Sequence, residues 1–184
     1  MGNGIQVTDA LFNQALDKLA QSKVEPWVPP YRPQNKEQPT LMVPIHDAIN
    51  VRRDISDMLK RLKANVVVAD TDPAYDWVDD RVMLPHPSMY EDEGHFYHSL
   101  FHELGHWTGV RMGRPMGLNH RLFVGAEEMI AELVAVFLCE AYGIAPYGSP
   151  AYLVTFSKGL PKELLPHIRE HAKRATQYLL AQRH

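Results

Sequence analysis

The sequence predicts an α+β fold that is mostly helical and carries one small antiparallel sheet. Apolar residues recur at helical spacing over several long stretches of the chain. Two short apolar runs, bounded by proline and acidic residues, lie between two of these stretches and are typical of strands. The chain has 184 residues, 45% of them hydrophobic, and a formal net charge of -3. These values suit one globular domain, and the bulk charge gives no argument for nucleic-acid binding.

The N-terminal quarter of the chain differs in composition from the rest. A first helix is expected near residues 8–22, where leucine and alanine recur at helical spacing. Residues 26–39 contain five of the 14 prolines, which excludes a helix and favours an extended arm. We therefore divide the chain into an N-terminal helix and proline-rich arm, 1–46, and a main domain, 47–184.

The main domain begins with a predicted helix followed by two strands. Asp47 can cap a helix that runs to about Lys63 and buries an isoleucine- and leucine-rich stripe. The run Asn-Val-Val-Val-Ala at 65–69 is typical of a buried strand. After the acidic turn region 70–80, the segment 81–84 alternates in polarity and is expected to form a second strand. The two strands together predict the small antiparallel sheet.

The rest of the chain is predicted to be helical, at about 91–108, 125–142, 149–158 and 161–182, with breaks that contain glycine and proline. The single cysteine, Cys139, lies in an apolar stretch and is expected to pack as a small hydrophobic residue, without an intramolecular disulfide. No stretch approaches the ~20 apolar residues of a membrane span. A cytoplasmic protein with no membrane partner is therefore expected.

One motif carries chemistry. Residues 101–107 read Phe-His-Glu-Leu-Gly-His-Trp and contain H-E-x-x-H within a predicted helix. His102 and His106 are four residues apart, about one helical turn, so both imidazoles face the same side. Two such histidines are suited to bind one Zn²⁺, and the intervening Glu103 is placed to act as general base on a metal-activated water.

A catalytic zinc usually has a third protein ligand. The next predicted helix offers Glu128 on the same stripe as several small residues, which would allow the two helices to approach closely. Glu128 is therefore the expected third ligand. Glu132, one turn later, is expected to orient an imidazole, and Glu127 is the alternative ligand.

These segments resemble a known family. The resemblance is carried by Asp-Arg-Val-Met-Leu-Pro at 80–85, by the H-E-x-x-H helix and by Glu-Glu-Met-Ile-Ala-Glu-Leu at 127–133. The chain resembles the zincin-like metallopeptidase domain of ArdC-type antirestriction proteins, also called the polyvalent-protein metallopeptidase domain, over roughly residues 48–182. The resemblance implies a zincin-like fold, a mobile-element or antirestriction setting, and protease activity carried by His102, Glu103, His106 and Glu128.

The sequence and the resemblance together predict a zinc-dependent metallopeptidase that hydrolyses peptide bonds of a protein or peptide substrate. The alternative is a zinc-containing antirestriction factor that binds DNA or protein with little or no turnover. Replacing Glu103 by glutamine distinguishes the two, because it should abolish hydrolysis and leave binding nearly intact.

Overall fold

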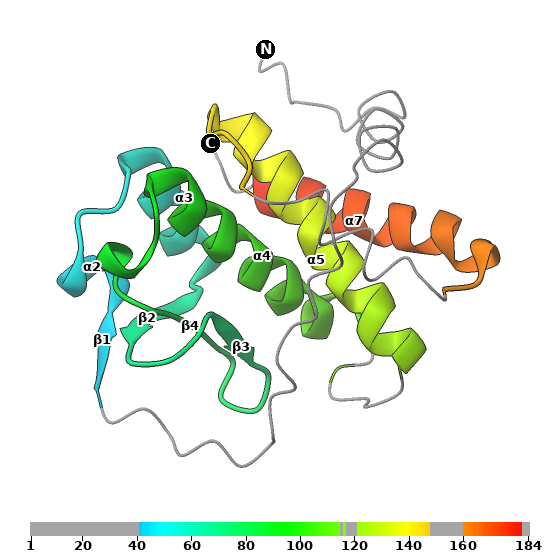
Figure 1. Ribbon diagram of the computed structural model, residues 1–184, viewed down its shortest axis with the longest axis horizontal. Helices are drawn as coiled ribbons and strands as arrows, with labels where there is room; N and C mark the ends of the chain where they lie inside the picture. The colour runs from blue at the N-terminus through cyan, green and yellow to red at the C-terminus, as the bar shows by residue number, and fades with distance from the viewer. Residues whose placement is uncertain (1–40, 115, 117–120, 148–159, 182–184) are drawn as a thin grey trace.

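The computed structural model describes residues 41–114, 116, 121–147 and 160–181 (Figure 1). The helices expected at 8–22 and 149–158 and the proline-rich arm at 26–39 lie outside the described residues.

The sheet has four strands, β1 (Met42–Pro44), β2 (Asn65–Ala69), β3 (Ala74–Asp76) and β4 (Arg81–Leu84), in the spatial order β1-β2-β4-β3. The two strands predicted from the sequence, β2 and β4, have the expected bounds. They pair in parallel, however, whereas β1 with β2 and β3 with β4 are antiparallel, so the sheet is mixed rather than wholly antiparallel. The parallel register runs from Asn65 opposite Arg81 to Val68 opposite Leu84.

The parallel pairing follows from β3, which the sequence did not predict. The chain leaves β2, forms β3 on the outer edge, and reverses into β4 through a turn in which Asp80 has φ 48°. Two reversals make β4 run in the same direction as β2. The edge strand β1 also lies within 1–46, so the last residues of the expected N-terminal segment belong to the sheet of the main domain.

The helix expected from Asp47 to Lys63 is two helices. Residues Ile45–Ala48 form the short α2, and Arg53–Leu62 form α3. The backbone between them is extended at Ile49, with φ -146° and ψ 161°, so Asp47 lies inside α2 and does not cap α3. Lys63 ends α3 in the left-handed conformation, as expected for a helix C-terminus.

Three long helices make up the rest of the described fold: α4 (Glu93–Arg111), α5 (Arg121–Tyr142) and α7 (Leu165–Leu180). The short 3₁₀ helices η1 (Pro87–Met89) and η2 (Lys162–Leu164) precede α4 and α7. In Figure 1, α4 lies between the sheet and α5, and α7 packs on the other side of α5. The α+β, mostly helical fold class is confirmed.

Helix α4 is the centre of the core because it is covered on two sides. Phe101, Leu104 and Trp107 are completely buried, and so are Leu133 and Leu138 of α5. The H-E-x-x-H segment is therefore part of the interior of the domain and not of an exposed helix. Among the described helices, none is both long and apolar enough to cross a membrane.

Candidate metal centre

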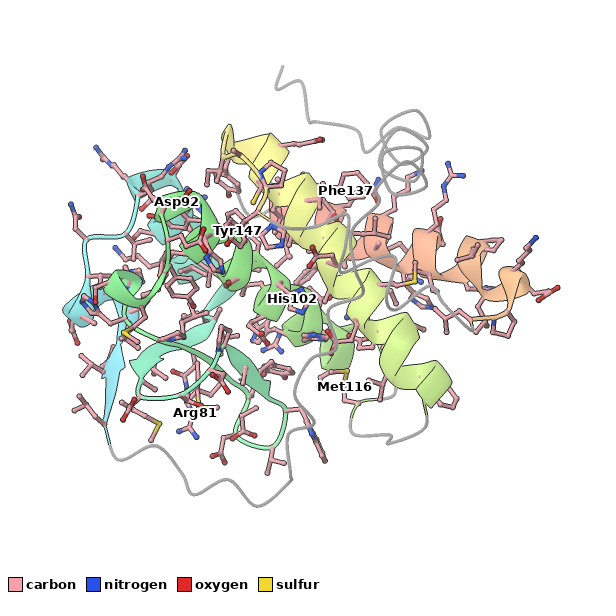
Figure 2. The ribbon with its side chains drawn as sticks, viewed as in Figure 1. Arg81, Asp92, His102, Met116, Phe137 and Tyr147 are labelled. Atoms are coloured by element: carbon pink, nitrogen blue, oxygen red, sulfur yellow. The ribbon has the colours of Figure 1, made fainter. Side chains whose placement is uncertain are left out.

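The site is formed where α4 passes close to α5. A β-carbon built on Gly105 would lie 2.7 Å from the Cα of Ala131 and 3.1 Å from its carbonyl oxygen, so any larger residue would push the helices apart. Gly105 lies between the two histidines of the motif. The close contact therefore brings both imidazoles next to the carboxylates of α5, and Figure 2 shows His102 at this crossing in the middle of the molecule.

Three of the side chains singled out in the sequence lie close together there. The Nε2 atoms of His102 and His106 are 3.1 Å apart. Glu128 of α5 places its Oε2 3.4 Å from Nε2 of His102 and its Oε1 3.7 Å from Nε2 of His106. Within the described residues, these three make up the group of donor atoms that are close enough together to hold one metal ion.

The spacing of the three donors fits a small divalent ion. A tetrahedral ion with ligand distances of ~2.0–2.1 Å keeps its ligand atoms roughly 3.3 Å apart. The two imidazole nitrogens are 3.1 Å apart, and each has an oxygen of the Glu128 carboxylate near that distance, Oε2 at 3.4 Å from His102 and Oε1 at 3.7 Å from His106. Two imidazoles and one carboxylate are also a donor set that catalytic zinc accepts.

The outer nitrogen of each imidazole faces another carboxylate. Nδ1 of His102 is 3.0 Å from Oε2 of Glu132, and Nδ1 of His106 is 3.3 Å from Oε1 of Glu127. A carboxylate accepts hydrogen bonds, so each neutral imidazole carries its proton on Nδ1 and directs the lone pair of Nε2 into the site. When both imidazoles are neutral, the two Nε2 lone pairs 3.1 Å apart repel each other, and a proton or a metal ion between them removes the repulsion.

The carboxylates around the site stabilise positive charge within it, on a protonated imidazole or on a bound cation. Burial lowers the pKa of both imidazoles, but the neighbouring glutamates outweigh it, raising the pKa of His102 well above its usual range and that of His106 to about 9. Burial likewise raises the pKa of the glutamates, and the histidines again outweigh it. The pKa of Glu128 falls well below its usual range, and the pKa values of Glu127, with help from Arg114, and of Glu132 fall to about 2.

The remaining predicted residue, Glu103, lies on α4 between the two histidines and is 7% exposed. Its charge raises the pKa of His102 and contributes to the raised pKa of Tyr90. The Glu103 carboxylate is therefore close enough to the histidine site to influence it electrostatically. The structure thus brings all six residues singled out from the sequence to one place: His102, Glu103, His106, Glu127, Glu128 and Glu132.

Two further residues of the cluster were not assigned to it from the sequence. His98, one turn before His102 on α4, places Nε2 3.2 Å from Oε1 of Glu132. Arg114, in the segment after α4, donates from Nε and Nη2 to the two oxygens of Glu127, both at 2.8 Å. The four-residue spacing from His98 to His102 could have indicated that His98 lies on the same face of the helix. No periodic pattern in the sequence indicated the position of Arg114.

Fold and site together define a helical domain of the H-E-x-x-H class, with a glutamate on the following helix. A family model described as zincin-like metallopeptidase matches residues 53–163, and the chain belongs to this family. The matched range includes α3, the strands β2 to β4, α4 and α5, and it ends before α7.

Two solved structures of the antirestriction ArdC protein from the R388 plasmid are similar to the fold. The Mn(II)-bound structure has a TM-score of 0.62 and 24% identity, and covers 73% of this chain and 53% of that one. The metal-free structure has a TM-score of 0.57 and 22% identity, and covers 73% of this chain and 51% of that one. With the family match, this similarity confirms the resemblance to ArdC-type proteins. The chain spans about half of ArdC.

A curated relative is the DNA primase TraC from Escherichia coli. It is 30% identical over 132 residues, which cover 67% of this chain. The chain spans 9% of the length of TraC.

Proposed function

We propose that this protein binds one divalent metal ion through His102, His106 and Glu128 and uses it to hydrolyse peptide bonds. The observation that carries the proposal is the donor set itself, with two Nε2 lone pairs and one carboxylate at nearly the spacing of a tetrahedral ion. Zinc suits these donors best. Manganese is the ion in the ArdC structure and is the second candidate.

A bound divalent ion supplies Lewis-acid chemistry, which polarises a carbonyl group and makes a neighbouring water more acidic. The protein's part is to hold the donors and to move the proton. Glu103, buried beside the histidines, would take a proton from the attacking water and pass it to the leaving amine. Glu127 and Glu132 keep each imidazole in the tautomer that leaves Nε2 unprotonated.

Metal content tests the first half of the proposal. Elemental analysis of the purified protein should find one metal ion per chain in the wild type, and none in His106→Ala or Glu128→Ala. Two matched controls change the same residue types outside the site, His86→Ala at an exposed histidine and Glu140→Ala at an exposed glutamate of α5. Both should keep the ion, and a folded wild type without metal would rule the proposal out.

Peptide hydrolysis tests the second half. A library of proteome-derived peptides, analysed by mass spectrometry, should be cleaved by the metal-loaded wild type. The Glu103→Gln variant should retain the ion and lose at least about a hundredfold in rate, as expected when a general base is removed. Equal cleavage by both proteins would show that Glu103 is not the base.

The second candidate function is a metal-containing antirestriction or DNA-associated factor with little turnover. It is favoured by the names of the relatives, an antirestriction protein and a DNA primase. Its test uses the same Glu103→Gln variant in two assays: protection of plasmid DNA from a restriction enzyme, and binding to single- and double-stranded oligonucleotides. Activity that survives the substitution, with no peptide cleavage in the wild type, would place this function first.

A further inference from the structure

Arg114 is a buried cation supplied by the segment that follows α4. The residue is 6% exposed, and its side chain donates four hydrogen bonds to oxygen atoms. Two of these bonds go to the carboxylate of Glu127. Nη1 donates to Oγ1 of Thr108 at 3.0 Å, and Nη2 donates to the carbonyl oxygen of Gly105 at 2.7 Å. A buried guanidinium is stable only when it is paired in this way, so Arg114 and Glu127 are a matched pair.

The pair determines what Glu127 can do. Arg114 binds both oxygens of this carboxylate, and Oε1 is also 3.3 Å from Nδ1 of His106. Glu127 is adjacent in sequence to Glu128, and both side chains lie against His106. Without the guanidinium, the Glu127 carboxylate would lose the two hydrogen bonds that fix it against Nδ1 of His106.

We propose that Arg114 is a positioning residue: it holds the Glu127 carboxylate against Nδ1 of His106 and so fixes the orientation of this imidazole. This inference rests on the proposed metal site, but not on peptide hydrolysis. It gives the two adjacent glutamates different tasks, because Glu128 lies toward Nε2 of His106 and Glu127 toward its Nδ1.

The other imidazole is supported differently. Glu132 is held by His98, so the set His98, Glu132 and His102 lies wholly within α4 and α5. Arg114 instead comes from outside both helices, and its bonds to Gly105 and Thr108 fasten its segment to the last turns of α4. The backbone N–H of Arg114 adds a hydrogen bond to the carbonyl oxygen of Gly109 at 2.9 Å.

Cobalt(II) is a suitable probe because its visible absorption weakens as the coordination number rises. The wild type loaded with Co²⁺ should show the intense bands of a four- or five-coordinate ion. In Arg114→Gln the Glu127 carboxylate is no longer fixed and leaves His106 less well oriented, so we expect weaker bands and a Co²⁺ affinity lowered by about 10–100-fold. Thr108→Val is the matched control. It removes one bond of Arg114 without touching Glu127 and should keep the wild-type spectrum, even if it lowers stability.

A double-mutant comparison shows whether Arg114 acts through Glu127. In a Glu127→Ala background, Arg114→Gln should change the Co²⁺ affinity by less than about twofold, because the residue through which it acts is gone. An equal effect in both backgrounds would overturn the inference, as would a folded Arg114→Gln protein with wild-type spectrum and affinity. If Arg114→Gln fails to fold, Arg114→Lys replaces it. Lysine keeps the charge but cannot bind both oxygens side by side, so the spectral change should persist.

The outcomes separate this inference from the proposed function. A wild type that binds no Co²⁺ would overturn both the metal site and the role of Arg114. A wild type that binds Co²⁺, with the expected response of the Arg114 variants but no peptide cleavage, would support the inference and remove only the hydrolytic function.

Discussion

Gly105 of α4 and Ala131 of α5 touch through their backbones: a β-carbon on Gly105 would come within 2.7 Å of the Cα of Ala131. The neighbouring atoms are backbone and not the end of a flexible side chain, so they cannot move aside without moving a helix. The distance from His102 and His106 to Glu128 therefore depends on a glycine at this position.

Gly105→Ala should destabilise the protein, although alanine is the better helix former. Inside a helix, glycine usually costs about 0.5–1 kcal/mol relative to alanine. Here the new methyl group overpacks the helix contact, and we expect a loss of about 1–3 kcal/mol in the free energy of unfolding, measured in urea by circular dichroism. Gly109→Ala is the control, since its β-carbon would meet the flexible side chain of Met116 and should cost less. An unchanged or raised stability of Gly105→Ala would contradict this interpretation.

Metal removal should lower the melting temperature. An ion present at about 100 times its dissociation constant adds roughly 2.7 kcal/mol to the stability, which for a chain of this size is roughly 5–10 °C. The chelator-treated wild type should regain this difference when zinc is returned. Glu128→Ala should not respond to zinc, whereas Glu140→Ala, at an exposed glutamate of the same helix, should respond like the wild type.

Glu132 should make the metal-free protein sensitive to acid. Its pKa is lowered to about 2, because His102 and His98 outweigh the opposing effect of burial. A lowered folded-state pKa adds stability that is present above the ordinary carboxyl pKa of 4.5 and is lost as the pH falls toward 2. Glu132→Gln should therefore be less stable than the wild type at pH 6, and the difference should shrink below pH 4.5 and disappear near pH 2. Urea midpoints across this range measure it, and parallel curves would refute the prediction.

Cys139 should be chemically inert in the folded protein. It is fully buried, and burial raises the pKa of its thiol to about 12. Thiolate is the reactive form, so iodoacetamide at pH 8 should leave the native protein unmodified and should label it in urea. Mass spectrometry gives the labelled fraction, and rapid labelling of the native protein would show that α5 opens readily.

The parts of the fold that could be predicted are those set by local pattern. The valine run of β2 and the alternation of β4 gave both strands at their observed bounds. The strands β1 and β3 have three residues each and little pattern of their own, and they exist because they pair with longer neighbours. Parallel pairing of β2 with β4 is likewise a property of the whole sheet, which no local pattern contains.

The candidate site divides in the same way. The spacing of His102 and His106 on one helix already places their imidazoles together. The sequence alone did not decide between Glu127 and Glu128 as the third ligand. Adjacent residues of a helix differ only in the direction in which their side chains leave the helix axis, and that direction relative to α4 is set by how the helices pack. Their contacts distinguish them: Glu128 approaches both Nε2 atoms, and Glu127 lies against Nδ1 of His106 and Arg114.

The donors His102, His106 and Glu128 come from two helices that are consecutive along the chain. An ion bound by them would act as a cross-link over the short stretch of chain between α4 and α5, and closing so short a stretch costs little entropy. Its effect would be local: backbone amides of α4 and α5 should exchange their hydrogens more slowly in the metal-bound protein, while those of the sheet, on the far side of α4, should exchange as before.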